Sequence, residues 1–185
     1  GRYRIGSDIV PALRAISDQP GRSQVQNARL FARLYMATDD ASLAMSDAKM
    51  HYNTWRPITA IRNGDKDGND ATVRDPEWTP MLPTPNFPEH PCGHCIYAGA
   101  VATIMAAETG DRPAAGVRVA SPLAQYSVQH VVPSWSEWMR QVSDSRIYVG
   151  AHFRFANEAG EEMGKVAANA VLVTVMKPLT AKKGR

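Results

Sequence analysis

Residues suited to binding and transforming an anion lie in three short stretches of the chain. In the densest, residues 87–100, a proline-rich loop ends in Cys92-Gly93-His94 and an apolar run follows. This pattern predicts a loop that turns into a buried helix, whose first backbone N–H groups and positive dipole end attract an anion. His94 is expected on the first turn, where a proton donor or acceptor can act on that anion. The alternative is a turn before a core helix with an ordinary hydrogen-bonded histidine.

The second stretch contains two cations, Lys49 and Arg56, seven residues apart. In a helix predicted over residues 43–61, they would lie within roughly 20° of the same face and about 10 Å apart along the axis. Such a pair can bind one anion from two sides. Pro57 is expected to kink this helix or to mark a restart, because a proline inside a helix lacks a donor and clashes one turn back. The alternative interpretation is two solvated cations.

The third stretch holds Arg146 and His152, six residues apart with Gly150 between them. A straight helix would point the two side chains about 120° apart. They converge only if the chain bends, and Gly150 is the residue that permits a bend. Taken alone, an unremarkable Arg and His remain the simpler interpretation.

The elements that would position these residues are mostly helical. Apolar spacing predicts helices over residues 5–19, from Ser23 to a break at residues 38–40, and over 43–61, 95–108, 134–144 and 155–176. Six prolines make residues 75–91 a long irregular loop, and weak alternation over 117–132 suggests a small β-hairpin. The fold class expected is an all-α helical bundle with one such hairpin.

Composition limits the function classes. The chain has 185 residues, 44% of them hydrophobic, which suits a single domain over residues 1–185 with a solvated tail at 177–185. A net charge of +3 with scattered Lys and Arg argues against nucleic acid as a partner, and no apolar run is long enough to span a bilayer. The chain begins at Gly1 with no initiator Met, as expected of a mature form or a fragment.

Together the three stretches are more specific than any one of them. Lys49-x6-Arg56-Pro57, then Pro91-Cys92-Gly93-His94, then Ser145-Arg146-x5-His152 resembles the signature shared by type 2 phosphatidic acid phosphatases, bacterial acid phosphatases and vanadium-dependent haloperoxidases. The flanks, residues 53–61 and 146–160, look like the haloperoxidase branch. The resemblance covers about residues 43–176.

The resemblance implies a helical bundle that holds vanadate and uses hydrogen peroxide to oxidise halide. It implies a secreted or periplasmic protein, and it places Phe87 near the halide. It also implies roles for seven residues: His152 as the vanadium ligand, His94 as the general acid/base, and Lys49, Arg56, Cys92, Gly93 and Arg146 as oxyanion contacts. The alternatives within the superfamily are a phosphatase that acts on a phosphate ester through a phosphohistidine at His152, and a non-catalytic oxyanion-binding domain. The halide, the organic substrate and the oligomeric state stay open.

Cys92 departs from the signature, which has Ser at this position. A thiol is a weaker hydrogen-bond donor and acceptor than a hydroxyl, and a helix N-terminus near cations makes it oxidisable. Cys92-Gly93-His94-Cys95 also matches the active-site tetrapeptide of protein disulfide isomerases, but the preceding strand of a thioredoxin-like module is missing. A local Cys92–Cys95 disulfide is a further alternative.

Overall fold

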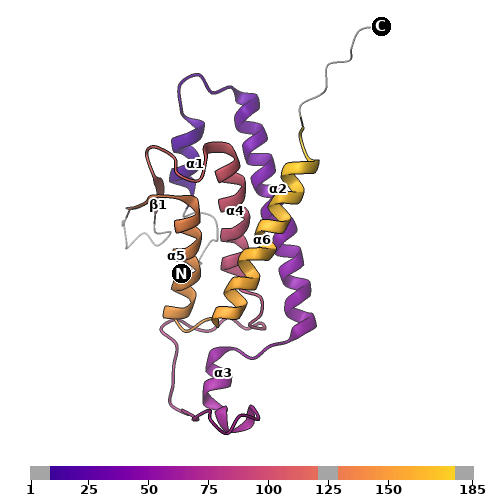
Figure 1. Ribbon diagram of the computed structural model, residues 1–185, viewed down its shortest axis with the longest axis vertical. Coiled ribbons are helices and arrows are strands. Elements are labelled where there is room, and N and C mark those ends of the chain that lie inside the picture. Colours follow the sequence, from indigo (N-terminus) through magenta and orange to yellow (C-terminus); the bar gives the residue numbers. More distant parts are fainter. Residues whose placement is uncertain (1–8, 121–128, 178–185) are drawn as a thin grey trace.

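A computed structural model describes residues 9–120 and 129–177 as an elongated helical bundle with one small hairpin (Figure 1). The all-α fold class and the hairpin are therefore confirmed. Residues 5–8 of the first predicted helix and residues 178–185 of the predicted tail lie outside the described residues. The elements are α1 (Val10–Ser17), α2 (Gln24–Tyr52), α3 (Pro57–Arg62), a 3-10 turn η1 (Gly64–Lys66), α4 (Gly93–Thr109), antiparallel β1 (Val117–Ala120) and β2 (Gln129–Val132), α5 (Trp135–Tyr148) and α6 (Arg154–Thr174).

Helix α2 is a single long helix, so the break predicted at residues 38–40 is wrong. It begins with a capping box, in which the Ser23 hydroxyl accepts from the Gln26 N–H and the Gln26 side chain accepts from the Ser23 N–H. The hydroxyl of Thr38 donates to the carbonyl of Leu34, one turn back in the same helix. Because the Thr38 hydroxyl is already bonded to a carbonyl of α2, Thr38 does not cap the start of a new helix.

The helix predicted over residues 43–61 is interrupted, since α2 ends at Tyr52. Asn53 takes the left-handed conformation at φ 45°, a residue type that tolerates this backbone at a helix end. The chain then restarts as α3 at Pro57, where the missing N–H costs nothing because the first helical N–H has no partner anyway. Of the two outcomes expected at Pro57, the restart is therefore correct.

Helices α4 and α6 pack backbone to backbone through small residues. A Cβ placed on Gly160 would lie 2.6 Å from the carbonyl oxygen of Cys92, and one on Gly164 would lie 2.7 Å from the N atom of Ala100. Contacts this short leave room only for glycine. The close approach holds the first turn of α4 against the first turns of α6.

The site residues are gathered by the directions of the helices. Figure 1 shows α2 and α5 running toward the same end of the bundle from which α4 and α6 begin. Ser134 caps α5 by accepting from the Glu137 N–H, at the start of the helix predicted over residues 134–144. Residues 75–91 form the expected irregular loop beside this end. Within the part of the chain that is described, no helix combines the length and the hydropathy that crossing a bilayer requires.

Candidate functional site

The start of α4 lies where an anion site was expected. Cys92 is the N-cap residue and Gly93 is the first residue of α4, so His94 stands on the first turn, as predicted. The Cys92 N–H donates to the carbonyl of Ala156 in α6, at 2.9 Å. The N-terminus of α4 is thereby fixed next to the turn that carries His152.

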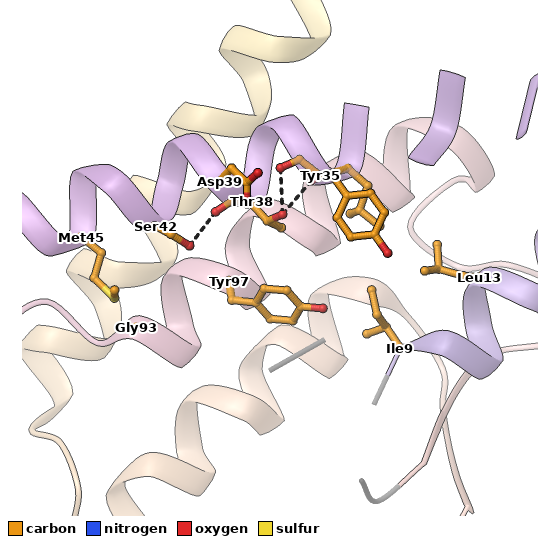
Figure 2. A pocket seen from close by; sticks show the side chains of 10 residues that line it. Ile9, Leu13, Tyr35, Thr38, Asp39, Ser42, Met45, Gly93 and Tyr97 are labelled. Atoms are coloured by element: carbon orange, nitrogen blue, oxygen red, sulfur yellow. Dashed lines mark hydrogen bonds between the residues drawn. The ribbon is translucent and has the colours of Figure 1, made fainter. Parts of the chain in front are cut away.

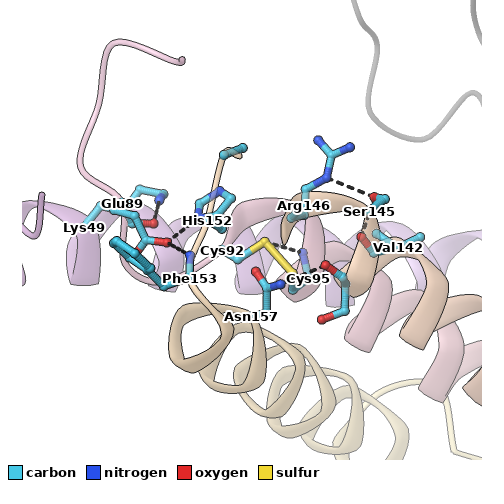
Figure 3. Close-up of a disulfide and its surroundings, with 12 residues drawn as sticks. Lys49, Glu89, Cys92, Cys95, Val142, Ser145, Arg146, His152, Phe153 and Asn157 are labelled. Atoms are coloured by element: carbon cyan, nitrogen blue, oxygen red, sulfur yellow. Dashed lines mark hydrogen bonds and ion pairs between the residues drawn. A yellow bond between two sulfur atoms is a disulfide. The ribbon is translucent and has the colours of Figure 1, made fainter. Parts of the chain in front are cut away.

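Cys92 and Cys95 form a disulfide, which was one of the alternatives for this pair (Figure 3). The sulfur of Cys92 accepts from the Cys95 N–H at 3.2 Å and carries no proton of its own. The hydrogen bond that Cys92 was expected to donate to an oxyanion is therefore absent from the oxidised form. A thioredoxin-like module is excluded, because α4 follows a proline-rich loop within a helical bundle.

Lys49 and Arg56 do converge, although not along one helix. Lys49 is 2% exposed and donates to the carbonyls of Pro88 and Glu89 at 2.8 and 2.9 Å. Arg56, 5% exposed, donates through Nε to the carbonyl of Phe87. The Phe87 ring lies 5.1 Å from the Lys49 ammonium and 5.0 Å from the Arg56 guanidinium, so both cations also contact its π face. The carbonyls of the loop ending at Glu89 thus hold Lys49 and Arg56 close together.

One nitrogen of the Arg56 guanidinium has no hydrogen-bond partner among the described residues. Its Nη1 donates to the carbonyl of Ala151 at 2.9 Å and lies 3.0 Å from Nε2 of His152, whereas Nη2 is buried and has no partner in the structure. A buried guanidinium N–H without an acceptor is costly, and an oxyanion would supply the acceptor. No cluster of His, Cys, Asp and Glu suited to a metal cation occurs in residues 9–120 and 129–177. The buried Nη2 donor fits an oxyanion such as vanadate or phosphate.

The predicted bend lies between Arg146 and His152 and turns the backbone at His152 back onto Arg146. Gly150 has φ +73°, and the N–H groups of Ala151 and His152 both donate to the carbonyl of Arg146. A Cβ on Gly150 would lie 2.8 Å from the Trp78 ring, so the long loop packs on this turn and requires glycine there.

The sequence analysis missed Glu89, which is fully buried and bonded to His152. Its Oε1 lies 2.8 Å from Nδ1 of His152 and accepts from the N–H of Phe153 at 2.9 Å (Figure 3). The signal available was an acidic residue in a proline-bounded stretch next to the motif. Its partner could not be predicted, because His152 is 63 residues away in the chain.

The charges of the site converge on His94. Burial, the positive charge of Arg146 and smaller effects of His152, Arg56 and Lys49 together lower the pKa of His94 to about 3. Burial also lowers the pKa of His152, and the hydrogen bond that His152 makes to Glu89 opposes this shift. Both imidazoles are therefore neutral at neutral pH. A bound anion would offset the cations and raise the pKa of His94, so that His94 can then take up a proton.

A separate cavity adjoins the first residue of α4. It has a volume of about 320 Å³ and lies between α1, α2 and α4, with Leu13, Tyr35 and Tyr97 among its lining residues (Figure 2). Met45 lies over Gly93 at its edge, where a Cβ on Gly93 would come within 2.6 Å of the Met45 sulfur. The cavity therefore reaches the backbone of the candidate anion site without containing its charged side chains.

The anion affinity of the site is expected to fall as the pH rises through about 8. Burial and the charge of Arg56 lower the pKa of Lys49 from 10.5 to about 8, so its positive charge is present at neutral pH and lost above that value. Above this pKa, each further pH unit is expected to weaken anion binding by up to about tenfold, because Lys49 must take up one proton when the anion binds. Calorimetry with sulfate, whose charge is constant in this range, measures the effect. Lys49→Met is expected to bind more weakly and to lose this pH dependence; an identical dependence in both proteins would contradict the assignment.

The converging ends of this helical bundle gather three cations and two neutral histidines. The chain belongs to the family of the VCPO second helical-bundle domain, whose family model matches residues 29–181. Its relatives place it in the haloperoxidase branch of the superfamily.

Three relatives illustrate the likeness. The vanadium chloroperoxidase of Curvularia inaequalis is 33% identical over 92 residues, which make up 43% of this chain and 14% of that protein. The crystal structure of a bacterial vanadium-dependent iodoperoxidase superposes with a TM-score of 0.77 at 22% identity, covering 89% of this chain and 38% of that one. A holo-type bacterial vanadium-dependent chloroperoxidase gives 0.68 at 18% identity, covering 85% and 38%. At these identities the two structures establish the fold, and the chain spans less than half the length of each relative.

Proposed function

We propose that this chain carries the vanadate centre of a peroxide-dependent haloperoxidase. The observation that supports it most directly is the pairing of His152 Nε2 with Arg56 Nη1, beside a buried Nη2 that has no partner. Bound vanadate would supply a Lewis-acid centre that activates hydrogen peroxide toward halide. Haloperoxidase activity is favoured over other oxyanion chemistry because the family and the relatives above bear the names of vanadium-dependent enzymes.

The residues of the chain have separate tasks in this proposal. Lys49, Arg56 and Arg146 neutralise the anion, with the guanidinium groups giving directional contacts. The N–H of Gly93 adds a donor at the start of α4, and the neutral His152 presents Nε2 to the metal. His94 accepts a proton from hydrogen peroxide once the anion has raised its pKa. The disulfide keeps Cys92 from reacting with peroxide as a thiol and supports an oxidising, secreted or periplasmic location.

A phosphatase is the second candidate, because a neutral Nε2 is a nucleophile as well as a ligand. In that reaction Nε2 of His152 forms a bond to phosphorus while the ester P–O bond breaks. A proton from His94 goes to the leaving alcohol, and water then releases phosphate from His152. The same cations would bind the phosphate ester.

One paired assay decides between the two candidates. A metal-free preparation is tested for peroxide-dependent bromination of a dye with and without orthovanadate, and for hydrolysis of p-nitrophenyl phosphate in the same buffer. We expect bromination that requires vanadate. Hydrolysis that vanadate inhibits, without bromination, would identify a phosphatase. Anion binding without either reaction would leave a non-catalytic oxyanion-binding domain.

A further inference from the structure

Glu89 is the most deeply buried charged residue at this end of the bundle. Its side chain is 0% exposed, and its Oε1 lies against both Nδ1 of His152 and the N–H of Phe153. Its backbone is also held, because its N–H donates to the carbonyl of Thr54 and its own carbonyl accepts from Lys49. Burying a carboxylate costs free energy. The complete burial of Glu89 therefore indicates that its position has a role.

The two contacts of His152 specify one tautomer. Oε1 of Glu89 already accepts from the N–H of Phe153, and the same oxygen faces Nδ1 of His152 as an acceptor. Nδ1 of His152 must therefore carry the proton. On the other side of the ring the partner of Nε2 is a guanidinium, which only donates, so Nε2 must carry the lone pair.

We propose that Glu89 positions His152: it holds the ring by Nδ1–H and turns the Nε2 lone pair toward the oxyanion site. The role of the anion in this inference rests on the proposed function, but the tautomer does not, because it is a property of the ligand-free protein. The rival explanation is that the negative charge of Glu89, rather than its geometry, matters.

Two substitutions separate geometry from charge. Glu89→Gln keeps an acceptor oxygen at the same reach and loses the charge, and its amide NH2 would occupy the place of Oε2, which has no partner in the structure. Glu89→Asp keeps the charge and withdraws the acceptor by one methylene. The exposed Glu162→Asp on α6 is the matched control.

The first readout is ¹⁵N NMR of the ligand-free, histidine-labelled proteins at one neutral pH, with His152→Ala to assign the signals. Wild type and Glu89→Gln are expected to show one protonated and one unprotonated ring nitrogen for His152. Glu89→Asp is expected to show averaged shifts from tautomer exchange. The second readout is orthovanadate affinity, expected to weaken by about 10- to 100-fold in Glu89→Asp, as for other residues that orient a metal-bound histidine.

The outcomes distinguish this inference from the proposed function. If Glu89→Asp keeps a single tautomer and Glu89→Gln loses it, the charge governs and the positioning role is overturned. If both variants keep the wild-type shifts, it is overturned as well, whatever happens to affinity. If the tautomer responds as expected but wild type binds no orthovanadate, the positioning role stands and the proposed vanadate centre fails.

Discussion

Replacing His152 with alanine is expected to abolish orthovanadate binding and peroxide-dependent bromination together. His152 is 6% exposed and is held by Glu89 through Nδ1 and by Arg56 at Nε2, so no neighbouring side chain can take its place. Activity should fall by at least about 10³-fold, since removing a residue that bonds directly to the reacting centre typically costs that much or more. The change is measured by bromination in the presence of orthovanadate and by calorimetric titration of orthovanadate.

The matched control for this change is His130→Ala. His130 lies on β2, where its Nε2 is paired with the side chain of Gln141 at an exposed position. This variant should keep wild-type activity and affinity. Turnover or vanadate binding that survives in His152→Ala would disprove the assignment of the site, provided that circular dichroism shows the variant to be folded.

His152→Ala would also inactivate the protein if it is a phosphatase, but a different intermediate would be lost. If the protein hydrolyses phosphate esters, His152→Ala should lose the covalent phosphohistidine as well as turnover. His94→Ala should slow the reaction but still form the intermediate when the leaving group is p-nitrophenol, which departs without help from a proton. The two histidines thus have separable roles in either chemistry.

Most of the site could be predicted from short-range patterns. His94 lies on the first turn of α4 because a proline-rich loop followed by small apolar residues dictates a helix start there. The backbone at His152 turns back onto the Arg146 carbonyl because Gly150 has the conformational freedom to bend between them. Each of these predictions needed only residues within a few positions of one another, where local conformational preferences decide.

The predictions that failed depended on contacts distant in the chain. Thr38 looks like a helix breaker, but packing of α2 along α4 and α6 overrides local propensity. Lys49 and Arg56 were expected on one helical face, whereas the carbonyls of the loop ending at Glu89 bring them together after α2 has ended. Glu89 itself was missed for the same reason, because nothing near it in the sequence identifies His152 as its partner.

Replacing Arg56 with alanine is expected to cause the second large effect, through anion affinity. The guanidinium makes hydrogen bonds to the carbonyls of Phe87 and Ala151, contacts His152, and keeps one buried nitrogen without a partner. Truncating one member of a buried, hydrogen-bonded charge pair costs about 2–5 kcal/mol, which corresponds to a roughly 30- to 5,000-fold loss of affinity. Calorimetry with orthovanadate measures this loss, and thermal unfolding reports the stability lost with the two carbonyl contacts.

Arg56→Lys tests whether charge alone is sufficient. A lysine keeps the charge but is a point donor, and it cannot reach two carbonyls, His152 and an anion at once, so its affinity should lie between wild type and Arg56→Ala. Arg154→Ala is the control, because Arg154 is an exposed cation whose only charged contact in the described residues is with Asp144, at 3.7 Å. That control should bind orthovanadate as wild type does. If Arg56→Ala also retained wild-type affinity, the buried Nη2 would not mark the anion site, and the three cations would have to be assigned a structural role.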